Sequence, residues 1–460
     1  MKIESGSSLR AVREAMGLSQ SKLSELTGIS QHLLSSFELE KLELDPTLLA
    51  KVSQALLDGS RVRGVVGRRK RYQSHTYKAV VHDAGRALKH IQSKGNVSYT
   101  ALLNALHASR SEQKHKALSL FAGCGGMSLG FSWAGYKIKG FVEIDEGLSE
   151  IYGENFPGAI KLGGDISSLS DSGIERTTEL VGDIDVIIGG PPCQGFSLSG
   201  KRAVSDPRNT LFLDYLRFVD VYRPKFAVLE NVRLLTSMRS PHGGFVKEEI
   251  EKEFYRRGYR VSIYDINAKS YGVPQHRERV FFFAIRDDIK DTCSFPGATH
   301  SQPSGDLFNV PMPYRTFADA CSDLPFLESG EASDDPLHCA VNHPSHVIDW
   351  LWDVKEGYSA HDNEDPSKRP PSGYNTTYKR QVWLEPSATV QTTFGMISGC
   401  RNVHPIATRS LTVREAARLQ SFPDAYKFKH SLGTIRTGIG NAVPPLLAYE
   451  IGKHILLYLL

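Results

Sequence analysis

The chain has 460 residues, of which 23 % are charged and 40 % hydrophobic, the composition of a globular protein with two or three domains. No apolar run approaches the ~18–20 residues that span a bilayer, and the N-terminal MKIESGSSLR has no apolar signal segment, so we expect a cytoplasmic protein with no membrane partner. The six cysteines are scattered without a C-x-x-C pair, which argues against a disulfide framework and for a reducing compartment.

The first 60 residues predict a bundle of short helices. Apolar residues recur at helical spacing from Leu9 to Leu56, and Ser19 and Ser30 stand where N-caps belong. Between two of these helices lies the turn TGIS, whose Gly28 can adopt a positive φ. Any small helical bundle has this periodicity, but the turn, caps and spacing together resemble the helix-turn-helix family of phage repressors and restriction–modification controllers.

That resemblance makes residues 30–38 the recognition helix and residues 1–60 a module that binds operator DNA. The expected solvent-facing side of this helix carries small polar groups that can reach base edges. These candidate DNA-binding residues are Gln31, His32, Ser35 and Ser36.

A basic segment follows the predicted bundle. Residues 61–116 carry 13 Lys and Arg against two acidic residues, whereas the whole chain has a net charge of only +4. Such a stripe is either a solvated linker or the electrostatic footprint of a polyanion, and nucleic acid fits the second reading. We expect a basic linker region over residues 61–115.

From about residue 116 the pattern changes to strand–loop–helix. The near-continuous apolar runs KALSLF, KGFVEID, DIDVIIGG, KFAVLENV and RVFFFAIR have strand length, and amphipathic stretches separate them. This alternation predicts an α/β domain over residues 116–290, with a parallel sheet covered by helices on both faces. In such sheets, ligands bind at the carboxyl ends of the strands.

The turn FAGCGG at 121–126 follows the first of these strands and opens a helix. Gly123, Gly125 and Gly126 permit a tight turn and a close approach of the backbone to a ligand. Glu143 and Asp165 stand at the ends of the next two strands, where an acid commonly binds ribose hydroxyls. Either acid alone could be a helix N-cap or part of a solvated loop, but the ensemble predicts a nucleoside-bearing cofactor.

Cys193 stands in GGPPCQGFS, directly after the strand DVII. The prolines stiffen this segment, and the glycines let its backbone pack close to a substrate. A buried inert cysteine is the usual alternative, but such cysteines lie within helices or strands. A thiol held at a strand end predicts a nucleophile, activated by a lowered pKa or a nearby base.

Two further groups are expected beside this thiol. Glu230 ends the strand of LENV and would emerge beside Cys193 if the two strands are adjacent, where partial burial could make it a general acid. In QHRER, an extended chain places Gln275, Arg277 and Arg279 on one face, and guanidinium groups there suit an anionic or carbonyl-rich substrate. A salt-bridged surface strand is the alternative.

Residues 291–404 are rich in Pro, Gly, Ser and charge, and predict a loop-rich second domain. The group His338, Cys339, His343 and His346 has metal-ligand chemistry, but Pro344 interrupts it and we expect no metal. Regular structure returns over residues 405–460, which begin with a capping box and close with an apolar helix after a Gly/Pro turn. The capping box consists of Thr412 and Glu415.

In this order, the motifs resemble the DNA (cytosine-5)-methyltransferase family of type II restriction–modification systems. The resemblance rests on FAGCGGMSLGF, GFVEID, GGDI, GGPPCQGFS, LENV, QHRERVFFFA, SLTVREAARLQSFPD and GNAVPPLLA, which span most of residues 116–460. It implies a Rossmann-like methyltransferase domain dependent on S-adenosylmethionine. A smaller target-recognition domain over residues 291–404 and residues 405–460 returning beside the first strand would complete the fold, after the N-terminal all-α domain.

The resemblance also implies roles for single residues. Cys193 would attack C6 of a cytosine flipped out of duplex DNA, Glu230 would serve N3, and Arg279 would contact O2 with support from Arg277 and Gln275. S-adenosylmethionine would become S-adenosylhomocysteine without a metal, and Thr389–Val390, like Thr392, would belong to the DNA-contacting segment. Cofactor-binding positions would be Phe121, Gly123, Gly125, Gly126, Glu143, Asp165, Ile166, Pro191 and Asn441. Ile144 departs from the aromatic residue that many relatives place against the adenine.

Three functions stay open on the sequence. The first is a nucleoid-associated DNA methyltransferase whose N-terminal module represses its own gene, with a partner restriction endonuclease encoded nearby. The second is a methyltransferase of RNA, because a tRNA-methylating branch shares the catalytic motifs. The third is a DNA-binding regulator on a silent catalytic scaffold.

Overall fold

The computed structural model describes residues 5–15, 19–27, 29–39, 48–49, 52, 93–109, 113–192, 211–240, 243–290, 294–302 and 311–459. Cys193, with the rest of residues 193–210, lies outside these ranges, as does most of the basic segment.

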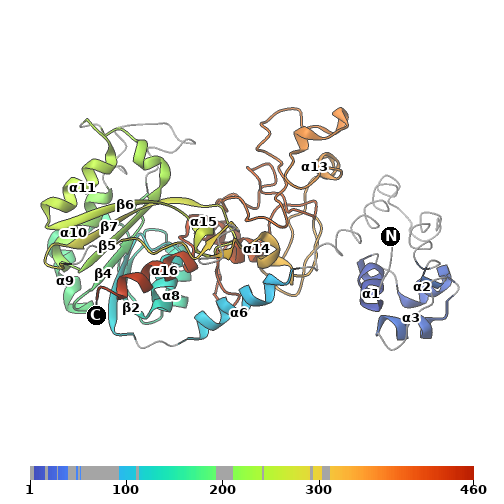
Figure 1. The fold of residues 1–460 in the computed structure, drawn as a ribbon, viewed down its shortest axis with the longest axis horizontal. Coiled ribbons are helices and arrows are strands. Elements are labelled where there is room, and N and C mark those ends of the chain that lie inside the picture. Colours follow the sequence, from blue (N-terminus) through green and yellow to red (C-terminus); the bar gives the residue numbers. More distant parts are fainter. Residues whose placement is uncertain are drawn as a thin grey trace.

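A seven-stranded sheet forms the centre of the described structure, in the order β3-β2-β1-β4-β5-β7-β6 (Figure 1). The first five strands run parallel, and β7 runs antiparallel to both β5 and β6. The strands are β1 (His115–Leu120), β2 (Tyr136–Val142), β3 (Ile160–Gly163), β4 (Val186–Gly189), β5 (Phe226–Val232), β6 (Tyr259–Asn267) and β7 (Glu278–Arg286). The predicted α/β fold is therefore confirmed, but the sheet is mixed rather than all-parallel.

The connection between β6 and β7 explains the antiparallel strand. A parallel neighbour needs a crossover of a dozen or more residues, usually a helix. Here the chain between Asn267 and Glu278 holds only a short 3-10 turn, Ala268–Tyr271, so it turns straight back along the sheet. This return places QHRER at the same edge as the carboxyl end of β5, with Arg279 opposite Val232.

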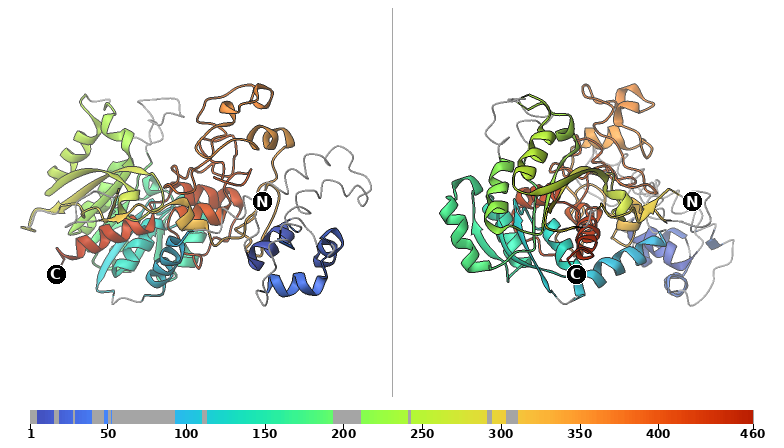
Figure 2. Two further views of the ribbon diagram at one scale, coloured as in Figure 1. Left: turned by 45° about the vertical axis from the view of Figure 1, so that its right-hand side comes forward. Right: turned by 60° about the vertical axis from the view of Figure 1, so that its left-hand side comes forward.

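Helices cover both faces of the sheet (Figure 2). Alternate strand residues divide between two buried clusters, as Phe281 and Phe283 do against Phe282 and Ala284. One face packs against α9 (Asp171–Val181), α10 (Leu211–Tyr222) and α11 (Val246–Arg256), and the other against α7 (Gly126–Ala134), α8 (Glu146–Asn155) and α16 (Pro445–Leu456). Both faces are buried, which is why the strands read as continuous apolar runs.

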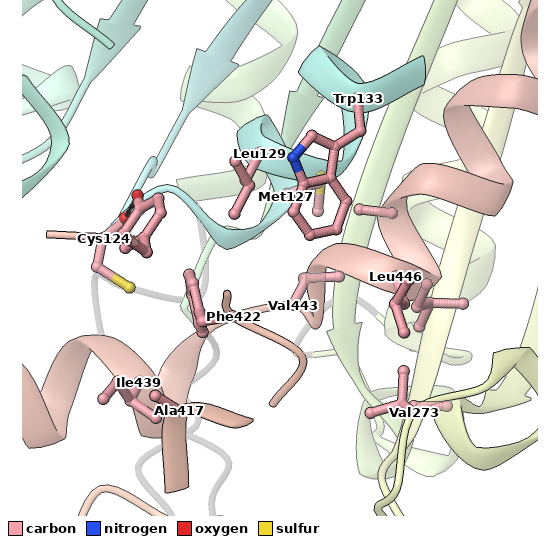
Figure 3. Close-up of a cluster of buried hydrophobic side chains, with 14 of the residues drawn as sticks. Cys124, Met127, Leu129, Trp133, Val273, Ala417, Phe422, Ile439, Val443 and Leu446 are labelled. Atoms are coloured by element: carbon pink, nitrogen blue, oxygen red, sulfur yellow. Dashed lines mark hydrogen bonds between the residues drawn. The ribbon is translucent and has the colours of Figure 1, made fainter. Parts of the chain in front are cut away.

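The C-terminal helix α16 packs on α7, the helix that follows β1. Tyr136 donates a hydrogen bond from its hydroxyl to the Gly452 carbonyl, and a Cβ at Gly130 would lie 2.3 Å from the Pro445 oxygen. In Figure 3, Val443 and Leu446 lie beside the apolar side chains of α7. The preceding helices are α14 (Val413–Leu419) and α15 (Leu432–Asn441), and α14 begins with the predicted capping box.

The region predicted to be loop-rich holds little regular structure where it is described. It contains α12 (Phe317–Cys321), α13 (Ser345–Leu351) and the short strands β8 (His300–Ser301) and β9 (Met312–Pro313). A buried arginine organises its loops, because Arg380 donates hydrogen bonds to the carbonyl groups of Leu351, His404, Ile406 and Ala407.

One helix lies within the segment expected as a linker. Helix α6 (Gly95–Ala108) packs on α12, with Asn96 donating to the Asp323 carboxylate and Tyr99 donating to the Arg418 carbonyl. Its docking partners stand more than 200 residues away in the sequence, so no local pattern could have revealed them. The last part of the expected linker therefore belongs to the folded body.

The N-terminal helices are α1 (Gly6–Ala15), α2 (Gln20–Thr27) and α3 (Gln31–Glu38). Ser30 caps α3 as predicted, accepting a hydrogen bond from the Leu33 amide. At the other end of α3, Glu38 accepts from Arg13 at 2.6 Å and from Gln20 at 2.7 Å. Burial opposes ionisation of Glu38, but these two partners lower its pKa and tie the three helices together. Across the described residues, no helix is long and apolar enough to cross a membrane.

Candidate active site

The carboxyl ends of β4 and β5 lie side by side, as the sequence analysis required. Gly189 pairs with Leu229 in the parallel ladder, which brings Gly190 against Glu230. A Cβ at residue 190 would lie only 2.8 Å from Oε2 of Glu230, so glycine leaves the space that the carboxylate occupies. Residues 189–192 thus run past Glu230 towards Cys193, which itself lies outside the described residues.

Glu230 and Arg279 form a buried ion pair at this edge. Oε1 of Glu230 lies 2.8 Å from Nε of Arg279, and the two side chains are 11 % and 16 % exposed. Burial raises the pKa of Glu230, while the positive charges of Arg279 and Arg277 partly oppose this shift. The site therefore holds a carboxyl group that stays protonated to higher pH than a solvated glutamate, as a general acid requires.

Asn231 ties the two strand ends together. Its side-chain amide donates to the Pro191 carbonyl at 2.9 Å, and its oxygen accepts from the Val232 amide at 2.8 Å. The residue is buried, and Pro191 stands two positions before Cys193. Sequence reasoning missed Asn231, although its place beside Glu230 in LENV was a usable signal.

Gln275 and Arg277 face inward and hold the framework of the site. The guanidinium of Arg277 donates to the carbonyl groups of Val390 at 3.2 Å and Gly440 at 2.9 Å. Gln275 accepts from the Val390 amide and donates to the Leu419 carbonyl. Both are fully buried, and burial lowers the pKa of Arg277. These two residues therefore join three distant segments, while Arg279 alone of QHRER pairs with Glu230.

The segment of Thr389 and Thr392 runs directly along this framework. Thr389 donates from its hydroxyl to the His276 carbonyl at 2.6 Å. A Cβ at Gly440 would lie 2.3 Å from the Thr392 amide nitrogen, so glycine permits this close approach. We call residues 389–395 the strap, because both of its ends are held in place. Thr389 binds the His276 carbonyl at one end, and at the other a Cβ at Gly395 would lie 2.5 Å from the guanidinium carbon of Arg436.

The turn after β1 has the features of a nucleoside cradle. Phe121 and Gly123 both adopt positive φ, at 53° and 56°, and a Cβ at Gly123 would meet no atom within 4 Å. Glu143, at the end of β2, accepts from the Gly123 amide at 2.7 Å and from the Asp145 amide at 2.9 Å. These hydrogen bonds hold the acid at the strand end, and they partly oppose the rise in the pKa of Glu143 that burial causes.

The three glycines of this turn have different tasks. A Cβ at Gly125 would lie 2.6 Å from the Phe156 ring, and a Cβ at Gly126 would lie 2.4 Å from the Val443 oxygen. These two positions need glycine because the protein's own side chains and backbone crowd them. Only Gly123 faces open space, so the close approach to a ligand that the sequence predicted falls on this residue.

The other expected cofactor positions lie near the same strand ends. Asp165 is exposed and caps a short 3-10 turn by accepting from the Ser167 amide, and Ile166 beside it is buried. Asn441 ends α15 with an exposed side chain, and Ile144 is 68 % exposed next to Glu143. An open glycine turn, a buried acid and an exposed apolar residue fit the sugar and base of S-adenosylmethionine.

The three histidines in residues 338–346 each contact other protein groups. His338 is buried and its ring nitrogens contact the Thr412 hydroxyl and the Pro325 carbonyl. His343 pairs with Ser410 at 3.1 Å, and His346 packs against Trp350. Within the described part of the chain, no His, Cys, Asp or Glu side chains gather into a group that could hold a metal ion.

The recognition helix presents part of its expected polar side. On α3, Gln31 is exposed and Ser35 and Ser36 are half-buried, while the side chain of His32 lies outside the described residues. The buried residues Leu34 and Phe37 occupy the opposite side of the helix.

Comparison with known proteins assigns a family to the N-terminal helices and another to most of the rest of the described fold. A family model described as C-5 cytosine-specific DNA methylase matches residues 115–457, and a helix-turn-helix model matches residues 9–56. The type II methyltransferase M.DdeI of Desulfomicrobium norvegicum is 36 % identical over 382 residues, which cover 74 % of this chain and 88 % of that protein. M1.HphI of Haemophilus parahaemolyticus is 38 % identical over 343 residues, covering 74 % and 86 %.

Solved structures agree with the fold. A DNA modification methyltransferase encoded within an E. coli prophage superimposes with a TM-score of 0.58 at 25 % identity, covering 75 % of this chain and 99 % of that one. A methyltransferase of Entamoeba histolytica gives a TM-score of 0.52 at 15 % identity, covering 76 % and 100 %.

Proposed function

The chain belongs to the C-5 cytosine-specific DNA methylase family, and we propose that it methylates one specific cytosine in duplex DNA through a covalent bond between Cys193 and C6 of the base. The observation that carries this proposal is the buried Glu230–Arg279 pair beside Gly190 and Pro191, three and two residues before the cysteine. A nucleophile, a proton donor and a cation would then meet at one strand edge.

The chemistry follows from the poor nucleophilicity of cytosine C5. The Cys193 thiolate adds to C6, N3 takes a proton from Glu230, and the resulting enamine carries electron density to C5. C5 would then bond to the methyl group of S-adenosylmethionine, with S-adenosylhomocysteine as the leaving group. C5 loses its proton to a base, N3 returns its proton to Glu230, and the C6–S bond breaks to restore the aromatic ring and the thiolate. Arg279 pairs with the Glu230 carboxylate in the free enzyme and would contact O2 when the base enters.

Residues of the cradle would hold S-adenosylmethionine, which supplies the methyl group when bound. Glu143 would accept hydrogen bonds from the ribose hydroxyls, Phe121 and Ile144 would border the adenine, and Asp165 would meet its amino group. The Gly123 amide already donates to Glu143, so the turn and the acid are preformed as one unit. Ile166, Pro191 and Asn441 complete the proposed contacts.

Replacing Cys193 with serine tests the reaction directly. A mixed-sequence duplex, incubated with S-adenosylmethionine and the wild-type protein, is expected to show protected cytosines within one short motif on bisulfite sequencing. The Cys193→Ser protein should lose this protection by about 10³-fold or more, because a serine hydroxyl is a far weaker nucleophile. Equal protection by both proteins would refute the covalent mechanism.

We further propose that the N-terminal module represses the gene of this protein by binding operator DNA. In a gel shift with the full chain, Gln31→Ala is expected to weaken binding to the upstream promoter by about 10-fold, the size of one lost base contact. Methyl transfer by the same variant to the target duplex serves as the control and should stay unchanged. Promoter binding no tighter than binding to random DNA would refute the proposal.

A further inference from the structure

The strap leads from the catalytic framework to an exposed arginine with an unusual backbone. After Gly395, Asn402 closes the next turn by donating to the carbonyl groups of Thr393 and Met396 at 2.9 and 3.0 Å. Arg401, immediately before it, is exposed and has a φ of 51°. The left-handed region favours glycine, and a residue with a Cβ persists there only when its surroundings determine the conformation.

The surroundings of Arg401 hold its backbone from two sides. Its amide donates to the Thr376 carbonyl at 3.1 Å, and its carbonyl accepts from the Gln381 side chain at 2.7 Å. Gln381 is buried and also accepts from the Ala388 amide, next to Thr389 of the strap. The backbone of Arg401 is therefore held by hydrogen bonds on both sides, while the residue itself is exposed.

The positive charge of Arg401 acts on His276, which lies between Gln275 and Arg277. Burial lowers the pKa of His276, and the positive charges of Lys269 and Arg401 lower it further. His276 stands between Gln275 and Arg277, and its carbonyl holds Thr389. Arg401 is thus connected to the QHRER segment in two ways. Its charge acts on His276, and Gln381 joins its carbonyl to Ala388, the residue before the strap.

We propose that Arg401 is a specificity-determining residue, whose guanidinium reads the O6 and N7 acceptors of a guanine in a base pair beside the target cytosine. The proposal rests on the proposed function, because it concerns the DNA that the same site methylates. A planar guanidinium suits two parallel hydrogen bonds to a guanine edge, and the held backbone of Arg401 fixes the point from which its side chain extends. A phosphate contact requires no fixed backbone, so it would not explain why an arginine is kept where glycine is favoured.

The test compares the wild type with Arg401→Gly as full-length proteins. Glycine relieves the left-handed backbone, so the variant should melt at or above the wild-type temperature. On the mixed-sequence duplex it should still methylate, but one G·C pair of the wild-type motif should lose discrimination by about 10- to 100-fold. Lys355→Gln removes a charge from an exposed side chain of the same region and should leave the motif unchanged.

Two results would overturn the proposal. One is an unaltered motif in Arg401→Gly. The other is an equal loss of rate on every sequence with a salt dependence reduced by about one counterion, which would mark a phosphate contact. The wild-type sample reports on the proposed function separately: if it methylates no duplex, the proposed function falls and this inference falls with it.

Discussion

Glu230→Gln is expected to lower kcat by about 10²- to 10⁴-fold, the range that a general acid contributes. Glutamine has the same shape and can still lie beside Arg279, but it cannot deliver a proton to N3. The Arg279 side chain is partly exposed, so water can solvate it once its partner is neutral, and the melting temperature should fall less than after the loss of a fully buried ion pair. The affinity for duplex DNA should change little. Single-turnover methylation at saturating DNA isolates this chemical step.

The pH dependence of the same variant gives a second readout. Burial raises the pKa of Glu230, so the protonated form persists to higher pH than for a solvated glutamate, and wild-type kcat should fall as the pH rises through that pKa. Glu230→Gln should lack this falling limb. Glu278→Gln is the matched control, because Glu278 stands next to Arg279 on the neighbouring strand β7, is exposed and pairs with Arg233 instead. A drop in kcat for Glu278→Gln as large as for Glu230→Gln would contradict the assigned role.

The strands could be predicted because each is a short apolar run between turns, and five of the seven appear in the sequence as such. The other two are the edge strands β3 and β6. Strand β3 could be inferred only from its place before Asp165, since its four residues are exposed or half-buried, and β6 was missed because most of its residues are half-buried and its pattern is less apolar. The antiparallel direction of β7 could not be predicted from the residues of β7 itself. It follows from the short connection after Asn267, which has no room for a crossover helix.

The approach of Glu230 to the cysteine-bearing segment could also be predicted, since parallel strands end at one edge. The inward orientation of Gln275 and Arg277 could not, because their partners Val390 and Gly440 stand more than 100 residues away in the sequence. Similarly, the sequence does not distinguish a glycine that faces open space, such as Gly123, from one that is crowded by Val443, such as Gly126. Long-range packing, rather than local pattern, separates these cases.

Glu415→Gln is expected to reduce the unfolding free energy by about 3–5 kcal/mol, as breaking a fully buried ion pair does. Glu415 accepts two hydrogen bonds from Arg409 at 2.7 and 2.8 Å, and both side chains have no exposed surface. Glutamine can still complete the capping box with Thr412, so the loss measures the charge rather than the cap. The uncompensated guanidinium would remain buried.

The stability that the Glu415–Arg409 pair contributes should also be lost when the wild-type protein is titrated with acid. Burial raises the pKa of Glu415, but Arg409 and His404 outweigh it and hold that pKa far below the usual value of about 4.3. A lowered pKa contributes stability that is present above the unfolded value and lost as the pH falls. The gap in melting temperature between wild type and Glu415→Gln should therefore narrow below about pH 4.3.

Asp335→Asn is the matched control, because Asp335 lies in a loop that contacts the same helix, α14. Asp335 pairs with Arg414 of α14, but its side chain is 31 % exposed, and such pairs contribute about 0–1 kcal/mol. Asparagine keeps the oxygen that accepts from the Leu337 amide. A larger loss of stability for Asp335→Asn than for Glu415→Gln would show that the buried pair does not hold α14 in place. We expect the larger loss of stability for Glu415→Gln, which would show that the buried pair holds α14 in place. Helix α14 in turn supplies the Leu419 carbonyl that accepts a hydrogen bond from Gln275, so the pair also supports the framework of the site.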